Sequence, residues 1–454
     1  MTTSLPPRPL PLAPGPKGTW PLGSAHAFRQ GFLHATTSGW RQYGDLVRFE
    51  IAGRTLLIVS HPDFAQHVLV DGAATFPKRD VRFGLGLLLG NGLVTNHDHA
   101  SWLSQRRMMQ PMFHKARLAT MAHKMEAAAA RLVDRLGAQA GRTVDIDVEM
   151  TSVTLDIITQ TMFSADLLGE AGKVGPAVAA GTRFVQARIQ APFSPPMSWP
   201  TPANKAFTRQ KGVIDAIVRR LVDERRASGE TKGDLLDMLL EARDEDTGEG
   251  MTDEQLRDEV LTIFGAGHET TANTLTFACW VLSQHPDVVA RLREELDRVL
   301  AGRLPTVADL PNLPFTRAVL DETLRLYPAA PVTSPRRAAH DTELGGWRVP
   351  AETNVFVSTF NIHRHPAFWP NAETFDPDRF LTGRLPAHRF AYLPFGAGAR
   401  KCIGTNLAVM EGALLLATLA SRFDFQPAEG FRMELEQTIT LRAKNGLPMI
   451  VTKR

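Results

Sequence analysis

The sequence has few cysteines, a small net charge and no long apolar run. Its 454 residues include two cysteines, Cys279 and Cys402. This number excludes a disulfide-dense secreted scaffold and a structural zinc site with four cysteine ligands. Cys279 lies in the apolar segment TFACWVL, which reads as a buried helix, so we expect a reduced, cytoplasmic protein. The net charge of +3 gives no sign of a nucleic-acid-binding protein.

The first residues, MTTSLPPRPLPLAPGPKGTWPLG, are rich in proline and contain no apolar run. A signal peptide requires such a run, and a membrane anchor requires about twenty apolar residues. We therefore expect no membrane anchor. The expected organisation is a flexible lead-in over residues 1–15 and one domain over residues 16–454, with a monomeric chain.

Hydrophobic periodicity predicts a mainly α fold with small peripheral β-sheets. Residues 100–163 have a helical pattern throughout. The longest helix is expected over residues 253–284, where Thr252 and Gln255 fit a capping box at its start. A last long helix is expected over residues 406–422.

Short strands are expected near both ends of the chain. The segment DLVRFEIAGRTLLIVS reads as two strands joined at Ala52 and Gly53. Near the C-terminus, TITLRAKNGLPMIV reads as strand pairs with Asn445-Gly446 as a hairpin turn.

The segment FGAGARKCIG places a cysteine between a glycine-rich turn and an apolar helix. The free N–H groups and the positive end of the helix dipole lower the pKa of a cysteine at a helix N-terminus. The resulting thiolate is a soft anionic ligand of the kind that iron binds. A structural alternative is a glycine-rich loop around a buried cysteine.

This segment resembles the cysteine signature of the cytochrome P450 superfamily, FxxGxRxCxG. Phe395, Gly398, Arg400, Cys402 and Gly404 match every defined position. The resemblance implies a mainly α fold with haem between the long helix and the cysteine loop. It makes Cys402 the axial ligand of the haem iron. It also implies that Phe395 and Arg400 contact the haem.

The long helix contains FGAGHETTANT, a poor helix sequence with two glycines and a run of β-branched and polar residues. Residues 266–270 resemble the family motif (A/G)Gx(E/D)T. The resemblance assigns Ala266 to the haem contact, and Glu269 and Thr270 to proton delivery during oxygen activation. A helix distortion with satisfied polar groups is the alternative.

Two further motifs support the resemblance. Glu322 and Arg325 form an ExxR pair, and the family joins such a pair to a later arginine, here Arg379 in PDRF; we expect a structural network. Trp102 and Arg106 match WxxxR, which binds a haem propionate in the family. The position of Arg336 resembles that of another propionate-binding arginine of the family. The neighbouring Arg337 is the alternative match for that position.

The resemblance implies a monooxygenase that inserts one atom of O2 into a lipophilic substrate by hydroxylation or epoxidation. The cofactor would be haem b (iron protoporphyrin IX). Its expected substrate pocket is lined by Phe83, Leu87, Phe264, Ala330, Val332 and Ile439. The character of these residues suggests a fatty acid, terpenoid or steroid.

Electrons are expected from a ferredoxin or flavodoxin with its reductase, so that NAD(P)H acts only indirectly. The donor would dock on a basic face formed by Arg106, Arg107, Arg389, Arg400 and Lys401. Two alternatives are a peroxide-driven haem peroxygenase and a non-catalytic haem-binding protein. No zinc site is expected at His97-Asp98-His99 or at His363-Arg364-His365, because neither has a third ligand at ordinary spacing.

Overall fold

The computed structural model describes residues 10–81, 84–164, 177, 180–188, 194–381 and 383–454. The chain divides into two compact units, and each is assembled from distant parts of the sequence. The first unit comprises Met1–Arg79, Arg325–Thr374 and Arg384–Cys402. The second comprises Asp80–Leu324, Phe375–Gly383 and Ile403–Arg454.

A four-stranded sheet organises the first unit. Its strands, in spatial order, are β1 (Leu46–Ile51), β2 (Arg54–Val59), β7 (Asn354–Val357) and β4 (Arg336–Arg337). β1 and β2 form the predicted antiparallel pair, whereas β2 and β7 are parallel. Ala52 and Gly53 take positive φ angles of 47° and 75°, as a tight two-residue hairpin turn requires.

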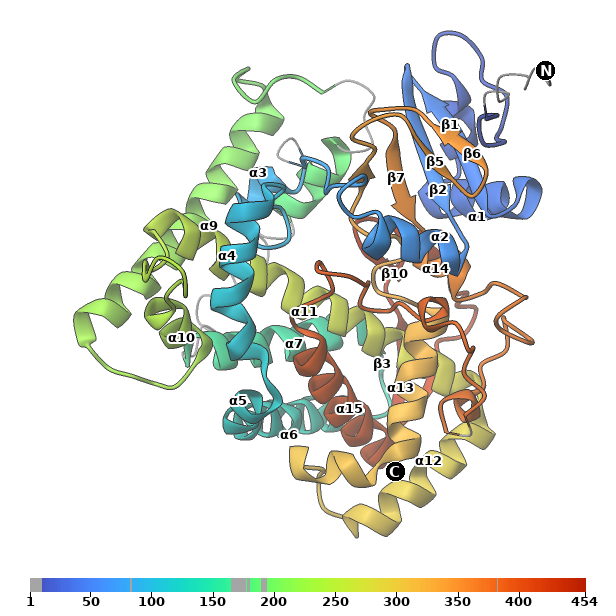
Figure 1. Cartoon of the computed structure of the whole chain (residues 1–454). Coiled ribbons are helices and arrows are strands. Elements are labelled where there is room, and N and C mark those ends of the chain that lie inside the picture. The colour runs from blue at the N-terminus through green and yellow to red at the C-terminus, as the bar shows by residue number, and fades with distance from the viewer. Residues whose placement is uncertain (1–9, 82–83, 165–176, 178–179, 189–193, 382) are drawn as a thin grey trace, which may run out of the picture. The chain divides into compact units, whose positions relative to one another are not determined.

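The first unit also contains short helices and a two-stranded sheet. These elements are η1 (Ser24–Phe28), α1 (Phe32–Tyr43), α2 (Pro62–Gln66), η2 (His67–Asp71), β5 (Thr342–Leu344), β6 (Trp347–Val349), α14 (Thr359–Ile362) and η6 (Arg389–Ala391). One apolar core joins strand residues of β2 and β7 to α2 and η2 through Val59, Val357, Ala65 and Val68. In Figure 1, β1, β2 and β7 lie side by side at the end of the unit that carries α1.

The second unit is helical. Its helices are α3 (Gly86–Leu89), α4 (His99–Met109), η3 (Gln110–Phe113), α5 (Lys115–Thr120), α6 (Ala122–Ala138), α7 (Ile146–Phe163), α9 (Pro202–Ser228), α10 (Leu235–Glu241), α11 (Asp253–Gln284), α12 (Pro286–Leu300), η4 (Val307–Asn312), η5 (Pro377–Phe380) and α15 (Thr405–Arg422). Helix α13 (Pro314–Leu326) ends at the boundary with the first unit. The mainly α fold with small sheets is therefore confirmed.

Two small sheets complete the second unit, and one expectation about them is wrong. β10 (Leu441–Ala443) pairs with β9 (Leu435–Gln437), while β11 (Pro448–Lys453) lies between β3 (Thr143–Asp145) and β8 (Phe423–Pro427). Asn445-Gly446 is therefore no hairpin turn between β10 and β11. The Asp145 carboxylate accepts the Leu447 N–H at 2.9 Å, which directs β11 onto β3. β3 also interrupts the helical run expected over residues 100–163.

Helix α11 has the predicted bounds and the predicted start. The Thr252 hydroxyl accepts the Gln255 N–H, and the Gln255 side chain accepts the Thr252 N–H, which completes the capping box. Most α11 residues are buried, and α11 lies beside α7 (Figure 1). Of the helices in the described part of the chain, none is long and apolar enough to cross a membrane.

Two adjacent acids near the start of α11 hold the loop that follows α3. Asp258 Oδ2 accepts the Asn91 N–H at 2.7 Å, and Glu259 Oε2 accepts the Leu93 N–H at 3.0 Å. Glu259 is fully buried, and burial raises the pKa of its carboxyl from 4.5 to about 8. The neighbouring Asp258 carboxylate adds to this rise.

The Glu259 carboxyl should make stability fall as pH rises. Because its pKa is higher in the folded chain, its contribution is present below pH 4.5 and is lost as pH rises to about 8. Glu259→Gln keeps an acceptor for Leu93 but does not titrate. The free-energy advantage of this variant over the wild type should grow across that window in urea unfolding followed by circular dichroism. Parallel pH curves for the two proteins would show that Glu259 ionises normally.

Candidate active site

The cysteine loop in the first unit is a tight turn that presents its thiol to solvent. The Cys402 N–H donates to the Phe395 carbonyl at 3.0 Å, and the Lys401 N–H donates to the Gly398 carbonyl at 3.1 Å. Gly396 and Gly398 have φ angles of 68° and 69°. A Cβ at Gly398 would overlap the carbonyl oxygen of Leu69. Only glycine satisfies both the conformation and the space at that position.

The two cysteines are in opposite environments. Cys402 is exposed and lies three residues before the first residue of α15. Cys279 is buried in α11, and burial raises the pKa of its thiol to about 12. Cys279 therefore stays protonated at neutral pH and is unsuited to bind a metal as a thiolate. Cys402 is the cysteine with the accessibility that a metal ligand needs.

Three cationic side chains gather in the first unit. Lys78 and Arg336 lie opposite each other in a β-bridge, and Lys78 Nζ donates to Ser334 Oγ at 2.6 Å. Burial, together with the charges of Arg400 and Arg336, lowers the pKa of Lys78 to about 7. The buried Nε of Arg336 has no hydrogen-bond partner within the described residues. This group therefore fits a ligand that carries carboxylates, as the haem propionates do.

Burial favours Arg336 over Arg337 as the propionate-binding arginine. Lys78 is a further cation beside Arg336, and the sequence motifs do not contain it. Arg336 is buried, whereas the neighbouring Arg337 points to the surface and pairs with Glu352. Lys78 stands in the segment FPKRD, far from Ser334 and Arg336 in the chain. No local pattern marks it, because its partners are reached only through the fold.

Helix α4 of the second unit carries the WxxxR pair. Asp98 caps the helix by accepting the Ser101 N–H at 2.8 Å. Trp102 is 2% exposed and stacks on His99 with ring centroids 5.8 Å apart. Arg106, one turn later, is half-buried, and its Nε donates to Gln110 Oε1 at 3.3 Å.

The middle of α11 is helical despite its sequence, and its threonines hydrogen-bond to backbone carbonyls four residues earlier. Thr270 Oγ1 donates to the Ala266 carbonyl at 2.9 Å, and Thr274 Oγ1 donates to the Thr270 carbonyl at 2.9 Å. Glu269 points elsewhere, where its Oε1 accepts the Thr440 hydroxyl proton at 2.6 Å. Asn273 Nδ2 donates in turn to Thr440 Oγ1 at 3.3 Å. Thr440 and Asn273 were not predicted as site residues.

The residues of the expected ion network are buried in both units. In the second unit, Glu322 Oε1 accepts the Asp376 N–H at 2.8 Å and lies 3.4 Å from Arg379 Nε. In the first unit, Arg325 donates to backbone carbonyls, namely those of His363 at 2.8 Å, Ala372 at 2.7 Å and Thr374 at 3.0 Å. Glu322 and Arg325 are both 0% exposed, as a structural role requires.

The residues expected to line a substrate pocket differ in how deeply they are buried. Leu87, Val332 and Ile439 are half-buried, Ala330 is exposed, and Phe83 lies outside the described residues. Phe264 is 6% exposed and borders a small apolar cavity. The other residues that line this cavity come from α7, α9 and α11. They are Phe163, Ile214, Ile217, Val218, Leu221, Val260 and Leu261.

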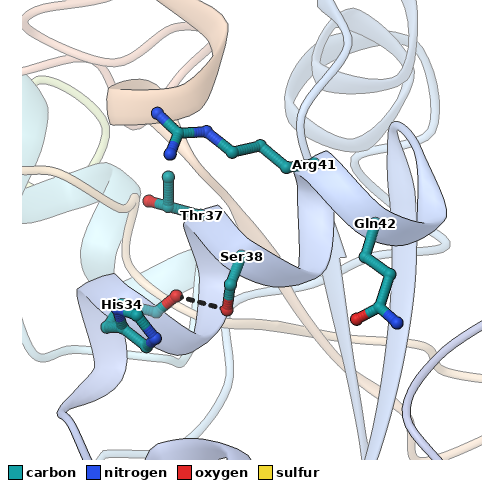
Figure 2. Close-up of a pocket in the computed structure, with 5 residues that line it drawn as sticks. All are labelled: His34, Thr37, Ser38, Arg41 and Gln42. Carbon is teal, nitrogen blue, oxygen red and sulfur yellow. Dashed lines mark hydrogen bonds between the residues drawn. The ribbon is translucent and has the colours of Figure 1, made fainter.

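A hollow of about 270 Å³ on α1 is polar and open, and it contains none of the predicted site residues. Figure 2 shows its lining, formed by His34, Thr37, Ser38, Arg41 and Gln42. Its Ser38 hydroxyl donates to the His34 carbonyl at 2.7 Å. This geometry is that of a helix surface rather than of a catalytic serine, whose hydroxyl donates to a base.

The sequence pattern of the cytochrome P450 family matches residues 13–449. The chain belongs to the cytochrome P450 family. Cyclooctat-9-en-7-ol 5-monooxygenase of Streptomyces melanosporofaciens is 37% identical over 435 residues, covering 91% of this chain and 92% of that protein. Pentalenene oxygenase of Streptomyces avermitilis is 36% identical over 411 residues, covering 88% of each chain.

A solved structure agrees with these relatives. The crystal structure of the cytochrome P450DA heme domain matches with a TM-score of 0.89 and 28% identity, over 98% of this chain and 99% of that one. This P450 is therefore a haem-dependent monooxygenase that uses O2 and electrons from a redox partner to oxidise a lipophilic substrate.

Removing the buried Glu322 carboxylate should destabilise the protein strongly. Glu322→Ala leaves the Asp376 N–H without its acceptor and removes the nearer of two carboxylates from the buried Arg379, whose Nε also lies 3.9 Å from Asp376 Oδ2. The expected loss of unfolding free energy is about 3–5 kcal/mol. Glu294→Ala, an exposed acid on α12, is the control and should change stability little. Equal urea midpoints for the two variants would contradict the structural role.

Proposed function

We propose that Cys402 is the axial ligand of haem b in this P450. The observation that carries the proposal is the cysteine loop, in which the Cys402 N–H to Phe395 carbonyl bond and two left-handed glycines hold an exposed thiol before α15. Phe395 and Gly404 would contact the haem beside the ligand, as the matched family positions imply. The high thiol pKa of the buried Cys279 leaves it no such role.

We propose that cationic side chains bind the haem propionates. Arg336 and Arg400 supply two of them, and Lys78 adds a third that the sequence motifs do not contain. A carboxylate near Lys78 would favour its charged form, because it would offset the repulsion from the two arginines. Trp102 and Arg106 would donate to propionate oxygens from α4.

On α11, the proposed role of Thr270 follows from the hydrogen bond that its hydroxyl makes. Haem, when bound, supplies the activation of O2 and the transfer of one oxygen atom to the substrate. The Thr270 hydroxyl proton is engaged with the Ala266 carbonyl, so its oxygen is left to accept a hydrogen bond from water. Ala266, without a polar side chain, would border the haem.

Glu269 would hold the proton that is passed to the active site. Its Oε1 is fixed by the Thr440 hydroxyl, and Thr440 is itself held by Asn273. This leaves the second carboxyl oxygen to exchange protons through water. We therefore propose that Thr440 and Asn273 position Glu269, and that Glu322, Arg325 and Arg379 have a structural role only.

We propose a cyclic terpenoid as the substrate. Two relatives of this P450 carry the names of oxygenases for cyclooctat-9-en-7-ol and pentalenene. The side chains around Phe264 are apolar, as a hydrocarbon-rich ligand requires, although the cavity of about 20 Å³ that they border is too small to hold a terpenoid. Leu87, Ala330, Val332 and Ile439 remain proposed pocket residues.

We propose that the electron donor is an acidic ferredoxin or flavodoxin, reduced by NAD(P)H through its reductase. Arg389, Arg400 and Lys401 flank Cys402 in the sequence and supply positive charge for docking. Arg107 contributes less than expected, because it pairs with Asp246. We also propose that the chain is monomeric and that residues 16–454 form one domain. A peroxide-driven enzyme is the second candidate, but the acid–alcohol pair on α11 favours the O2-dependent reaction.

Cysteinate ligation is tested by the absorption spectrum of the reduced, carbon monoxide-bound protein. The wild type and Cys279→Ala should show the strongly red-shifted Soret band of a cysteinate-ligated haem, and Cys402→Ala should lose it. The physical reason is that the thiolate donates electron density to the iron. A wild-type spectrum in Cys402→Ala would refute the ligand, whatever its haem content.

Thr270→Ala should uncouple electron consumption from product formation, because the hydroxyl oxygen no longer orders water beside the site. The substrate is first found by screening cyclic terpenes for the spin-state change that binding causes. With that substrate, the product formed per NAD(P)H should fall several-fold in Thr270→Ala and hydrogen peroxide should rise. Thr274→Ala removes the same type of backbone bond one turn later and is the matched control.

Unchanged coupling in Thr270→Ala would remove Thr270 from the proton path. The absence of a spin-state change with any cyclic terpene, but a change with fatty acids or steroids, would contradict the substrate class and leave the reaction class intact. Turnover with peroxide alone, and none with reductase and NAD(P)H, would favour the peroxygenase.

A further inference from the structure

A second cluster of possible metal ligands lies in the first unit, among residues to which the oxygenase reaction gives no role. One carboxylate oxygen of Asp45 and one ring nitrogen each of His61 and His365 lie within 4.8 Å of one another. Asp45 stands between α1 and β1, His61 caps α2, and His365 follows α14. His365 is buried, and the other two are half-buried.

The cluster is held in place by its surroundings. Trp40 Nε1 donates to Asp45 Oδ1 at 3.0 Å, and the backbone carbonyl of Asp45 accepts the Ser60 N–H at 2.8 Å. The ring of His365 lies 5.5 Å from that of His61 and 5.1 Å from that of Phe368, measured between centroids. Three separate segments are thereby brought to one point.

The charge of the cluster favours a cation. The ion-pair partner of Asp45 is His365, whose Nε2 lies 3.1 Å from Asp45 Oδ1, and no lysine or arginine pairs with Asp45 among the residues described. The hydrogen bond from His365 lowers the pKa of Asp45, which keeps the carboxyl ionised. Burial lowers the pKa of His61, which favours its neutral, metal-binding form.

Two more titratable groups lie next to the cluster. His61 Nδ1 is 3.6 Å from Asp63 Oδ2, and His388 Nε2 is 2.8 Å from Asp63 Oδ1. Asp63 therefore adds a second carboxylate, shared with a third histidine. The local balance of two carboxylates and three histidines is negative whenever two or more of the histidines are neutral.

We propose that Asp45, His61 and His365 bind a divalent transition-metal ion, with zinc as the best match. Two imidazoles and one carboxylate are a ligand set that zinc accepts, with water as a fourth ligand. The 3.1 Å between His365 Nε2 and Asp45 Oδ1 is near the separation of about 3.3 Å between ligand atoms in a tetrahedral site. His61 Nδ1 accepts the Asp63 N–H at 3.2 Å, and this bond must be lost whichever ring nitrogen of His61 binds the metal.

Metal binding requires a proton shift within the His365 ring. Its Nδ1 accepts the Ala367 N–H at 3.2 Å, so that Nε2 carries the proton in the neutral ring. When Nε2 binds the metal, that proton must move to Nδ1, and the bond from Ala367 is lost. No proton is released overall from a neutral ring. This cost predicts a dissociation constant in the micromolar range rather than the tight binding of a preformed zinc finger.

The bound ion would join the end of α1, the start of α2 and the segment after α14. This inference is independent of the haem chemistry proposed above. The segment His363-Arg364-His365 has no third ligand at ordinary spacing because the other two proposed ligands, Asp45 and His61, lie near the opposite end of the chain.

The test is equilibrium dialysis of the purified, haem-loaded full chain against zinc chloride after chelator treatment, with zinc and iron counted by mass spectrometry. We expect one zinc per haem iron in the wild type. Asp45→Asn, His61→Gln and His365→Gln should each weaken binding at least tenfold, whereas the control His34→Ala, a histidine on α1 outside the cluster, should not. Occupancy should fall in acid, where protons compete with the metal for its ligands.

A thermal scan of the same proteins gives a readout that does not depend on activity. Zinc should raise the unfolding temperature of the wild type and of His34→Ala, and not that of His61→Gln. His61 is half-exposed, so this variant should fold even if His365→Gln does not. The absence of stoichiometric zinc in the wild type, or equal binding in His61→Gln and His34→Ala, would overturn the proposal and leave a hydrogen-bonded cluster only.

Discussion

One backbone hydrogen bond, from the Cys402 N–H to the Phe395 carbonyl, closes the loop that carries the proposed haem ligand of this P450. A thiolate ligand must be fixed in position and yet be accessible to a metal, and a helix interior offers only the first. The turn resolves this conflict by packing its glycine backbone, rather than side chains, against the Leu69 carbonyl. The sulfur is thereby left on the outer side of a rigid loop.

The buried charges of the two units are compensated in different ways. In the second unit, two buried carboxylates accept backbone N–H groups: Glu259 accepts from Leu93, and Glu322 accepts from Asp376. In the first unit, Lys78 donates to a serine hydroxyl, and Arg336 Nε has no acceptor among the described residues. Since a buried cation without an anion is costly, the open Nε of Arg336 and the lowered pKa of Lys78 favour an anionic partner at this point of the first unit.

The features that could be predicted from the sequence are those with local causes. The capping box fixed the start of α11, and the Ala52-Gly53 turn fixed the pairing of β1 with β2. The cysteine motif located the exposed cysteine that we propose as the ligand. The contacts that escaped prediction join distant segments: Thr440 to Glu269, Lys78 to Ser334, and β11 to β3. Asn445-Gly446 has the sequence of a hairpin turn, but the competing bond from Leu447 to Asp145 decides the pairing.

The two cysteines show why residue type alone does not define a site. Cys279 lies on the same helix as Thr270 and is closer to it in sequence than Cys402 is, yet its burial raises its thiol pKa to about 12. Cys402 is exposed and precedes the first residue of α15 by three positions in the sequence. Both environments follow from where each cysteine stands relative to a helix: inside it, the thiol is an apolar core group, and just before it, the thiol can become a ligand.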